Sequence, residues 1–180
     1  MMHRMAAVTF IATAIAAGAC GSSNDTTSPG SAIIHFSANL TPAGEPSVKG
    51  NPTSSGTFTA TLDTTTNVFT WSLTFQGLTS PLSMAHIHAP FALGGAATSA
   101  PVVVNFDPAS GQIAGETLTG VGSATSGSAS GSVVLNSSVQ LGAGVRGDSL
   151  KTLLLAGLTY VNVHSATNPA GEIRAQIAKQ

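Results

Sequence analysis

Two stretches in which apolar residues alternate with threonine or serine constrain the fold of this chain more than any other feature. Apolar side chains occupy every second position of residues 57–62 and again of residues 69–75. Neighbouring side chains of a β-strand point to opposite faces, so each stretch predicts a strand with one apolar and one hydroxyl-bearing face. The polar residues 63–67 between them are few enough for a hairpin loop. The two apolar faces are therefore expected to lie side by side and to supply much of a hydrophobic core.

The composition favours the same kind of structure. Charged residues make up only 7% of the chain, whereas 44 of its 180 residues are Ser or Thr, and 20 Gly and 9 Pro add turn-forming positions. Such a composition favours strands and turns, because long helices normally carry Glu, Lys, Gln or Arg on their wet face. The formal net charge is −1, which excludes the basic surface that nucleic-acid binding requires. We therefore expect one all-β domain with no nucleic-acid partner.

Shorter segments extend this prediction along the chain. Further strands are expected at residues 33–40, 84–88, 102–106, 132–135, 160–164 and 172–178. Residues 120–132, which are rich in Gly, Ser and Ala, predict a mobile loop. One short helix is expected at residues 150–156, with Asp148 or Ser149 capping its start and Gly157 ending it. Many short strands with frequent turns predict a sandwich or a barrel.

The first residues have the layout of an export signal. Arg4 precedes an uncharged run, residues 6–17, that is too short to span a bilayer. The run ends in Ala-Gly-Ala-Cys, which resembles the lipobox of bacterial lipoproteins, although Ala17 stands where Leu is usual. Residues 1–19 are therefore predicted to be a signal peptide, and Cys20 is predicted to be acylated. The alternative is ordinary cleavage that leaves Cys20 without a lipid.

Cys20 is the only cysteine of the chain, and its position decides the predicted location. Residues 21–31 offer no apolar residue to fold around, so residues 20–31 predict a flexible tether, and residues 32–180 the folded domain. An acylated Cys20 would anchor the exported protein to a membrane through its lipid, in the outer membrane or periplasm of a Gram-negative host. Without the lipid, the protein would be secreted.

Three later clusters carry polar side chains inside otherwise apolar strands. They are residues 84–90, 160–164 and 169–176. Alternation turns the apolar residues of each cluster to one face and the polar residues to the other. The polar residues are His86 and His88 in the first cluster, Asn162 and His164 in the second, and Glu172, Arg174 and Gln176 in the third. The two histidines of the first cluster lie about 7 Å apart along their strand, a spacing at which two imidazoles can reach one metal ion.

These clusters also resemble a known family. The motifs His-Ile-His-x-Pro, Tyr-Val-Asn-Val-His and Pro-x-Gly-Glu-Ile-Arg-x-Gln, in this order, resemble the CHRD (chordin-type) domain, which occurs in chordin and in many secreted bacterial proteins. The resemblance covers roughly residues 33–178, with Ala89 and Ala175 standing where the family commonly has Gly. It implies a β-sandwich of immunoglobulin-like, Greek-key type and no defined reaction. Residues and resemblance together predict an all-β, antiparallel β-sandwich with one short helix, in a CHRD protein of bacterial lipoprotein type.

The histidines are the strongest candidates for a binding site. If their strands are neighbours in space, His86, His88 and His164 form a three-imidazole site for zinc or copper with one open position. Glu172 would be a fourth ligand or an acceptor that orients a histidine, and Asn162 is the other residue expected to orient one.

An alternative without metal has equal weight. The histidines and Asn162 would then only hydrogen-bond to one another and to neighbouring loops. Arg174, which otherwise would lie beside the metal ligands, would form a weak surface ion pair with Glu172. His35 is interpreted as structural and Trp71 as part of the core.

Three functions are therefore open at this point. The first is an exported, envelope-anchored binding module for a metal, a small ligand or a protein. The second is a metalloenzyme, because a histidine-rich site on a β-sandwich is similar in architecture to copper–zinc superoxide dismutase. The third is a structural lipoprotein without ligand. No catalytic residue is predicted, because the chain lacks the Gly-x-Ser-x-Gly and Gly-x-x-x-x-Gly-Lys motifs and none of its seven acidic residues forms an evident acid–base pair.

Overall fold

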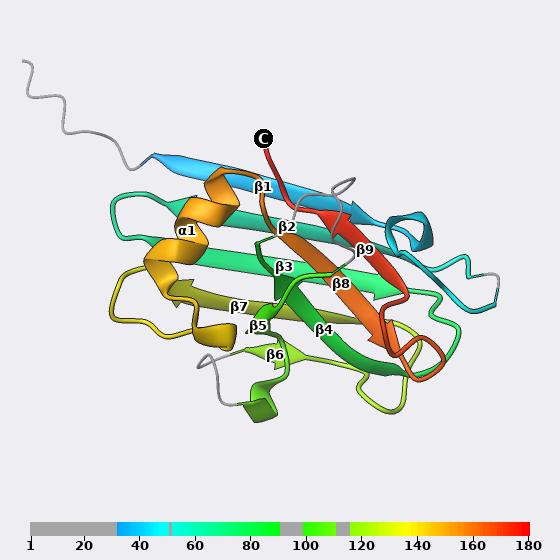
Figure 1. Ribbon diagram of the computed structural model, residues 1–180. Coiled ribbons are helices and arrows are strands. Elements are labelled where there is room, and N and C mark those ends of the chain that lie inside the picture. The colour runs from blue at the N-terminus through cyan, green and yellow to red at the C-terminus, as the bar shows by residue number, and fades with distance from the viewer. Residues whose placement is uncertain (1–31, 51, 91–98, 111–115) are drawn as a thin grey trace, which may run out of the picture. The chain divides into compact units, whose positions relative to one another are not determined.

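The computed structural model describes residues 32–50, 52–90, 99–110 and 116–180. Within these ranges, ten β-strands form two antiparallel sheets that enclose one hydrophobic core (Figure 1). The predicted all-β sandwich is confirmed. The predicted signal peptide, Cys20 and the predicted tether lie outside the described residues. No helix in the described part of the chain combines the length and the apolar character needed to cross a bilayer.

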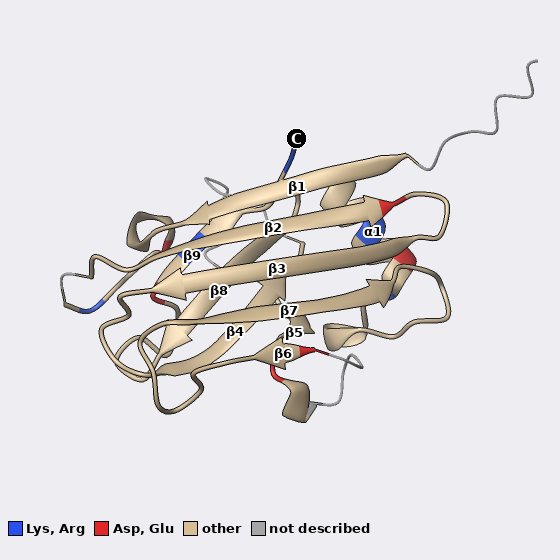
Figure 2. Cartoon of the chain, turned by 180° about the vertical axis from the view of Figure 1, so that it is seen from behind, with Lys and Arg blue, Asp and Glu red and all other residues tan. Residues whose placement is uncertain are grey.

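The larger sheet has six strands in the order β10-β1-β2-β3-β7-β6. Their bounds are β1 Ile33–Leu40, β2 Ser55–Asp63, β3 Val68–Gln76, β6 Thr117–Leu118, β7 Gly127–Val134 and β10 Ala178–Lys179. The predicted hairpin is confirmed as β2 and β3, with Thr59 opposite Ser72 and Ala60 opposite Trp71. Figure 2 shows the backbone of this sheet from the outer side. The outward positions of the hairpin are mainly Thr and Ser, and charged residues occur in the six strands only at Asp63 and Lys179.

The smaller sheet has four strands in the order β5-β4-β8-β9. Their bounds are β4 Leu82–His88, β5 Val102–Asn105, β8 Tyr160–Ser165 and β9 Ile173–Gln176. The inner face consists of apolar side chains, and Ile87, Val161 and Ile173 are fully buried there. Aromatic rings join the two sheets, because Phe106, directly after β5, stacks on Trp71 at 5.8 Å and on Phe58 at 6.5 Å between ring centroids. The prediction of Trp71 as a core residue is thus confirmed.

The predicted loop at residues 120–132 is wrong over its second half, because β7 begins at Gly127 and pairs with β3 along its length. The physical reason lies in β3, whose rings need small residues opposite them. A Cβ atom on Gly131 would lie 2.4 Å from the Trp71 ring, and Ala129 is buried beside them. Gly and Ser in this segment therefore make room for a neighbour instead of conferring mobility.

The one α-helix among the described residues, α1 (Gly147–Leu155), begins earlier than predicted. Asp148 and Ser149 lie inside its first turn, and the residue that precedes the helix is Arg146, without a side-chain cap. Gly157, with φ at +67°, ends the helix as predicted. The helix buries Leu150 and Leu154 at one end of the core (Figure 1), and three 3₁₀ turns, Pro42–Gly44, Pro108–Ser110 and Gly142–Gly144, complete the helical elements of the described residues.

The predicted last strand, residues 172–178, is divided between the two sheets. Its first part is β9 in the smaller sheet, and β10 pairs with β1 in the larger sheet. Between them Ile177 is fully buried, and its N–H donates to the carbonyl of Thr159 at 2.9 Å. The end of the chain therefore joins both sheets.

Candidate metal centre

Pairing of β4, β8 and β9 brings the three polar clusters together on the outer face of the smaller sheet. His86 lies opposite Asn162, and Asn162 lies opposite Arg174 on the other side. His88 lies opposite Tyr160, and His164 lies opposite Met84. The condition for a three-histidine cluster, that the two strands be neighbours, is met.

This polar face is buried. His86, His88 and His164 are 5%, 7% and 6% exposed, and Asn162 is 2% exposed. Glu45 and Ser47, from the connection between β1 and β2, line a pocket over this face together with His88 and His164. The face therefore differs from an ordinary outer surface, because its polar groups must find partners inside the protein.

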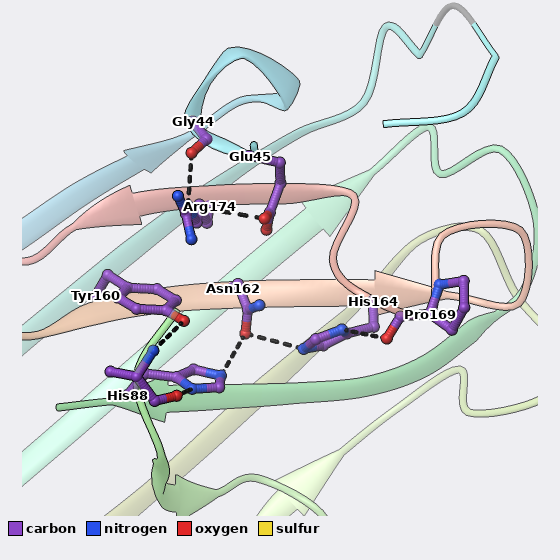
Figure 3. A network of polar contacts seen from close by, with 9 residues as sticks. Gly44, Glu45, His88, Tyr160, Asn162, His164, Pro169 and Arg174 are labelled. Carbon is purple, nitrogen blue, oxygen red and sulfur yellow. Dashed lines mark hydrogen bonds and ion pairs between the residues drawn. The ribbon is translucent and has the colours of Figure 1, made fainter. Parts of the chain in front are cut away.

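The histidine nitrogens converge on one another and on an amide oxygen. One ring nitrogen of each of the three histidines lies within 4.8 Å of the other two. Nδ1 of His86 is 3.1 Å from Nε2 of His164. Figure 3 shows Oδ1 of Asn162 between Nε2 of His88, at 3.1 Å, and Nε2 of His164, at 3.0 Å. Ligand atoms around a tetrahedral zinc ion lie about 3.3 Å apart, so the 3.1 Å between His86 and His164 is close to that of a metal site, whereas a separation of 4.8 Å is wider than in one.

Backbone carbonyls fix the hydrogens of two of these rings. Nδ1 of His88 is 2.7 Å from the carbonyl oxygen of Ala100, and Nδ1 of His164 is 3.0 Å from that of Pro169. A carbonyl oxygen only accepts, so each Nδ1 carries a hydrogen. In the neutral ring the Nε2 atom then carries a lone pair directed into the cluster.

Burial keeps the three rings neutral. It lowers the pKa of His86 to about 3, with further lowering by His164 and His88. It lowers the pKa of His164 to about 4, against the opposing hydrogen bond to Pro169 and with a smaller contribution from His88. It also lowers the pKa of His88 despite hydrogen bonds to Ala100 and Asn162. Neutral imidazole is the form that binds a metal ion.

Arg174 pairs with Glu45, and the predicted surface ion pair with Glu172 is wrong. Nε of Arg174 donates to the carbonyl of Gly44 and lies 3.7 Å from Oε2 of Glu45, and its guanidinium carbon lies 4.9 Å from the centroid of the Tyr160 ring (Figure 3). Burial raises the pKa of Glu45 to about 7, although the Arg174 charge and a hydrogen bond from the Asn162 amide lower it. That hydrogen bond directs the amide nitrogen of Asn162 towards Glu45 and its oxygen towards the histidines.

Glu172 does not join the histidines, although the sequence made it a candidate fourth ligand. Its carboxylate accepts hydrogen bonds from the backbone N–H and the hydroxyl of Thr79, at 2.8 and 2.7 Å, from the hydroxyl of Ser165, and from the amide of Asn168 at 3.1 Å. Burial would raise the pKa of Glu172, but these hydrogen bonds together lower it below its ordinary value. Glu172 thus holds the turn before β9 to the connection between β3 and β4.

Sequence reasoning missed Glu45 and the two carbonyl oxygens that orient the histidines. Backbone acceptors leave no trace in a motif, since any residue supplies a carbonyl. Glu45 did offer a signal, because an acidic residue is rare in this chain and this one stands between Gly44 and Pro46. Its partner Arg174 is distant along the chain. Arg174 and Gly44 are 130 residues apart, and Glu45 directly follows Gly44.

The fold and the site together define a class: a β-sandwich domain whose smaller sheet carries a buried histidine cluster, as expected of a binding module. A family model for the CHRD domain matches residues 36–177, which is most of the chain. The protein therefore belongs to the CHRD domain family. No curated protein and no solved structure matches the chain.

Proposed function

We propose that this CHRD domain is a metal-binding module that holds one zinc or copper ion through His86, His88 and His164. The three imidazoles supply nitrogen ligands of the kind both metals prefer, and a three-histidine set leaves a coordination position open. The hydrogen bonds from the rings to Ala100 and Pro169 are those that commonly orient metal-bound histidines.

One observation carries the proposal: the histidine cluster contains more hydrogen-bond acceptors than hydrogen atoms to bind them. Nε2 of His88 and Nε2 of His164 each direct a lone pair towards Oδ1 of Asn162, at 3.1 and 3.0 Å. Oδ1 is itself only an acceptor. The ring hydrogens of His88 and His164 are directed to the carbonyls of Ala100 and Pro169, so only that of His86 is left for the cluster, and Nδ1 of His86 faces Nε2 of His164 at 3.1 Å. Acceptors at such distances repel one another, and a cation among them removes the repulsion.

Metal content tests this proposal directly. The purified protein, reconstituted with zinc or with copper and then desalted, is expected to retain one equivalent of metal by inductively coupled plasma mass spectrometry. The double variant His86→Ala, His88→Ala is expected to retain none. His35→Ala is the matched control, because His35 lies on the exposed face of β1, away from the cluster. Absence of stoichiometric metal in the wild type would contradict the proposal.

The same preparation separates a binding module from a metalloenzyme. If the copper-loaded protein disproportionates superoxide and the double variant does not, the site is catalytic. We expect no such activity, because none of the seven acidic residues of the sequence forms an evident acid–base pair and a binding module requires only the bound ion. Zinc and copper are distinguished by competition for the same protein, with copper expected to bind more tightly.

We propose further that the domain acts outside the cytoplasm, anchored to a membrane through a lipid on Cys20. Support comes from the sequence alone, in the export signal of residues 1–19 and the lipobox-like Ala-Gly-Ala-Cys. Expression in a bacterial host with radiolabelled palmitate is expected to label the wild type and not the variant Cys20→Ser. An unlabelled wild-type protein found in the medium would instead indicate secretion without a lipid.

A further inference from the structure

Asn162 lies at the centre of the histidine cluster. Its strand, β8, has a neighbour on each side, because it lies between β4 and β9 in the smaller sheet. On the outer face of the sheet, Asn162 is opposite His86 and two residues before His164. His88 is opposite Tyr160, which is two residues before Asn162. The Asn162 side chain is therefore next to all three proposed ligands, and it is only 2% exposed.

The two ends of the Asn162 amide have different partners. Oδ1 is 3.1 Å from Nε2 of His88 and 3.0 Å from Nε2 of His164 (Figure 3). The amide hydrogen-bonds to the side chain of Glu45 through its nitrogen. This second contact assigns the orientation of the amide, with the oxygen towards the histidines. The fold thus presents one amide oxygen to two ring nitrogens.

The contacts of Oδ1 are those of a metal ligand and differ from those of a group that orients a histidine. An orienting acceptor binds a ring hydrogen. The ring hydrogens of His88 and His164 are directed to the carbonyls of Ala100 and Pro169 instead. Each Nε2 atom therefore presents a lone pair to Oδ1 of Asn162, which has only lone pairs to offer in return. A cation shared by the three atoms would turn this repulsion into attraction.

We propose that Oδ1 of Asn162 is the fourth ligand of the ion and fills the position that three histidines leave open. This inference rests on the proposed metal site. The donor atoms would be Nδ1 of His86, Nε2 of His88 and of His164, and Oδ1. Three of their separations are 3.1, 3.1 and 3.0 Å, close to the value of about 3.3 Å around a tetrahedral zinc ion. Four protein ligands are typical of an ion that is held rather than of one that reacts.

Azide tests whether the protein itself fills this position. Azide is a small anion that binds to an open position of a metal ion. The full-length protein is loaded with Co²⁺, whose visible absorption changes when a ligand enters its coordination sphere, and is titrated with azide. We expect the wild-type spectrum to stay unchanged. In Asn162→Ala the position is open, and azide is expected to bind at least about ten-fold more tightly than to the wild type.

A second variant separates the loss of a donor atom from the space that alanine leaves. Asn162→Leu fills this space with a side chain that has no lone pair. Its cobalt spectrum is expected to differ from that of the wild type even without azide, because the ion has lost a ligand. Asn39→Ala is the matched control, because Asn39 is exposed on β1 of the larger sheet. The control is expected to keep the wild-type spectrum and its insensitivity to azide.

The outcomes distinguish the fourth ligand from the metal site itself. A wild-type protein that binds azide as tightly as Asn162→Ala would overturn the fourth ligand and leave the three-histidine site standing. An Asn162→Leu spectrum identical with that of the wild type would do the same, since Asn162 would then only occupy space. A wild-type protein that binds no cobalt, zinc or copper would overturn both proposals together. A cobalt spectrum that depends on Asn162 and not on Asn39, with no azide binding to the wild type, supports the fourth ligand.

Discussion

The outer faces of the two sheets arise from the same alternation of side chains, but that of the larger sheet is exposed to water and the polar face of the smaller sheet is buried. On the larger sheet, Thr59 and Ser72 lie opposite each other and are exposed. On the smaller sheet, the corresponding outward residues, such as Asn162 and His164, are buried. The alternation therefore shows which side chains point away from the core. The connections between strands determine whether those side chains are exposed to water.

The difference has an energetic consequence. Exposed hydroxyls keep their hydrogen bonds to water, so they constrain neither one another nor the fold. Buried imidazoles and carboxylates lose that water and must be compensated by partners of matching type. Specific chemistry is therefore expected on the smaller sheet, and the larger sheet is expected to tolerate substitution.

The largest contrast is expected from histidines on the two sheets in the presence of metal. Zinc at one hundred times its dissociation constant should stabilise the wild type by about 2.7 kcal/mol. His164→Ala should abolish this stabilisation, whereas His35→Ala, on β1 of the larger sheet, should retain it. Thermal unfolding with and without zinc measures both. The same zinc-induced rise in Tm in His164→Ala would show that the cluster does not hold the ion.

A smaller effect is expected from Glu172, which lies at the smaller sheet but outside the cluster. Glu172→Gln should lower the free energy of unfolding by about 2 kcal/mol, because it weakens hydrogen bonds from Thr79 and Ser165 to a charged group. Metal stoichiometry should not change. Urea unfolding and metal analysis of the same samples check both, and loss of the metal would return Glu172 to the ligand set.

This contribution should depend on pH in a defined direction. The pKa of Glu172 in the folded protein is lowered, so its stabilising effect is complete above the ordinary carboxyl pKa of 4.5. It is lost as the pH falls through the folded-state pKa. The difference between wild type and Glu172→Gln should therefore shrink in acid.

Glu116, directly before β6 of the larger sheet, should show the opposite dependence. Burial, and to a lesser degree Asp107, raises its pKa from 4.5 to about 7. The unfolded chain ionises first, so stability from this residue is complete below pH 4.5 and is lost as the pH rises towards 7. Glu116→Gln should remove a decline of the order of 1 to 2 kcal/mol, measured by urea unfolding between pH 4 and 8. Parallel curves for the two proteins would contradict the assignment.

The smallest change in stability is expected from a substitution in the middle of the exposed face of the larger sheet. Thr59→Ala should change the free energy of unfolding by less than about 0.5 kcal/mol, because the side chain is exposed and its hydroxyl has water as a partner. Urea unfolding at neutral pH measures it. A loss as large as that of Glu172→Gln would mean that this face, too, is covered.

The sequence predicted most of the fold because its strands alternate clearly. Strand β1 and the β2–β3 hairpin follow from periodicity alone, and Gly157 marked the end of α1 correctly. The end of β7 was predicted, as the strand at residues 132–135, but its first part escaped prediction because Gly and Ser have little strand preference of their own. Its conformation is determined by the rings of Trp71 and Phe75 in β3, and such tertiary contacts are not visible along the chain.

The site was predictable only in its side chains. The pattern of His86, His88 and His164 identified the cluster once β4 and β8 were assumed to be neighbours. What a motif could not show is the cover over the face, including Glu45, or the real partners of Glu172. These depend on loops whose positions are set by contacts between residues far apart in the sequence, such as the one between Arg174 and Gly44.

The distance along the chain between the histidines has a consequence for the order of events in the cell. His86 and His164 are 78 residues apart and come together only when β4 pairs with β8. An unfolded chain thus has no complete ligand set, so an ion held by the proposed site would enter only after the sandwich has formed. If the chain crosses a membrane unfolded, it arrives without metal. The ions available at its destination, rather than those at the ribosome, would then determine which metal it carries.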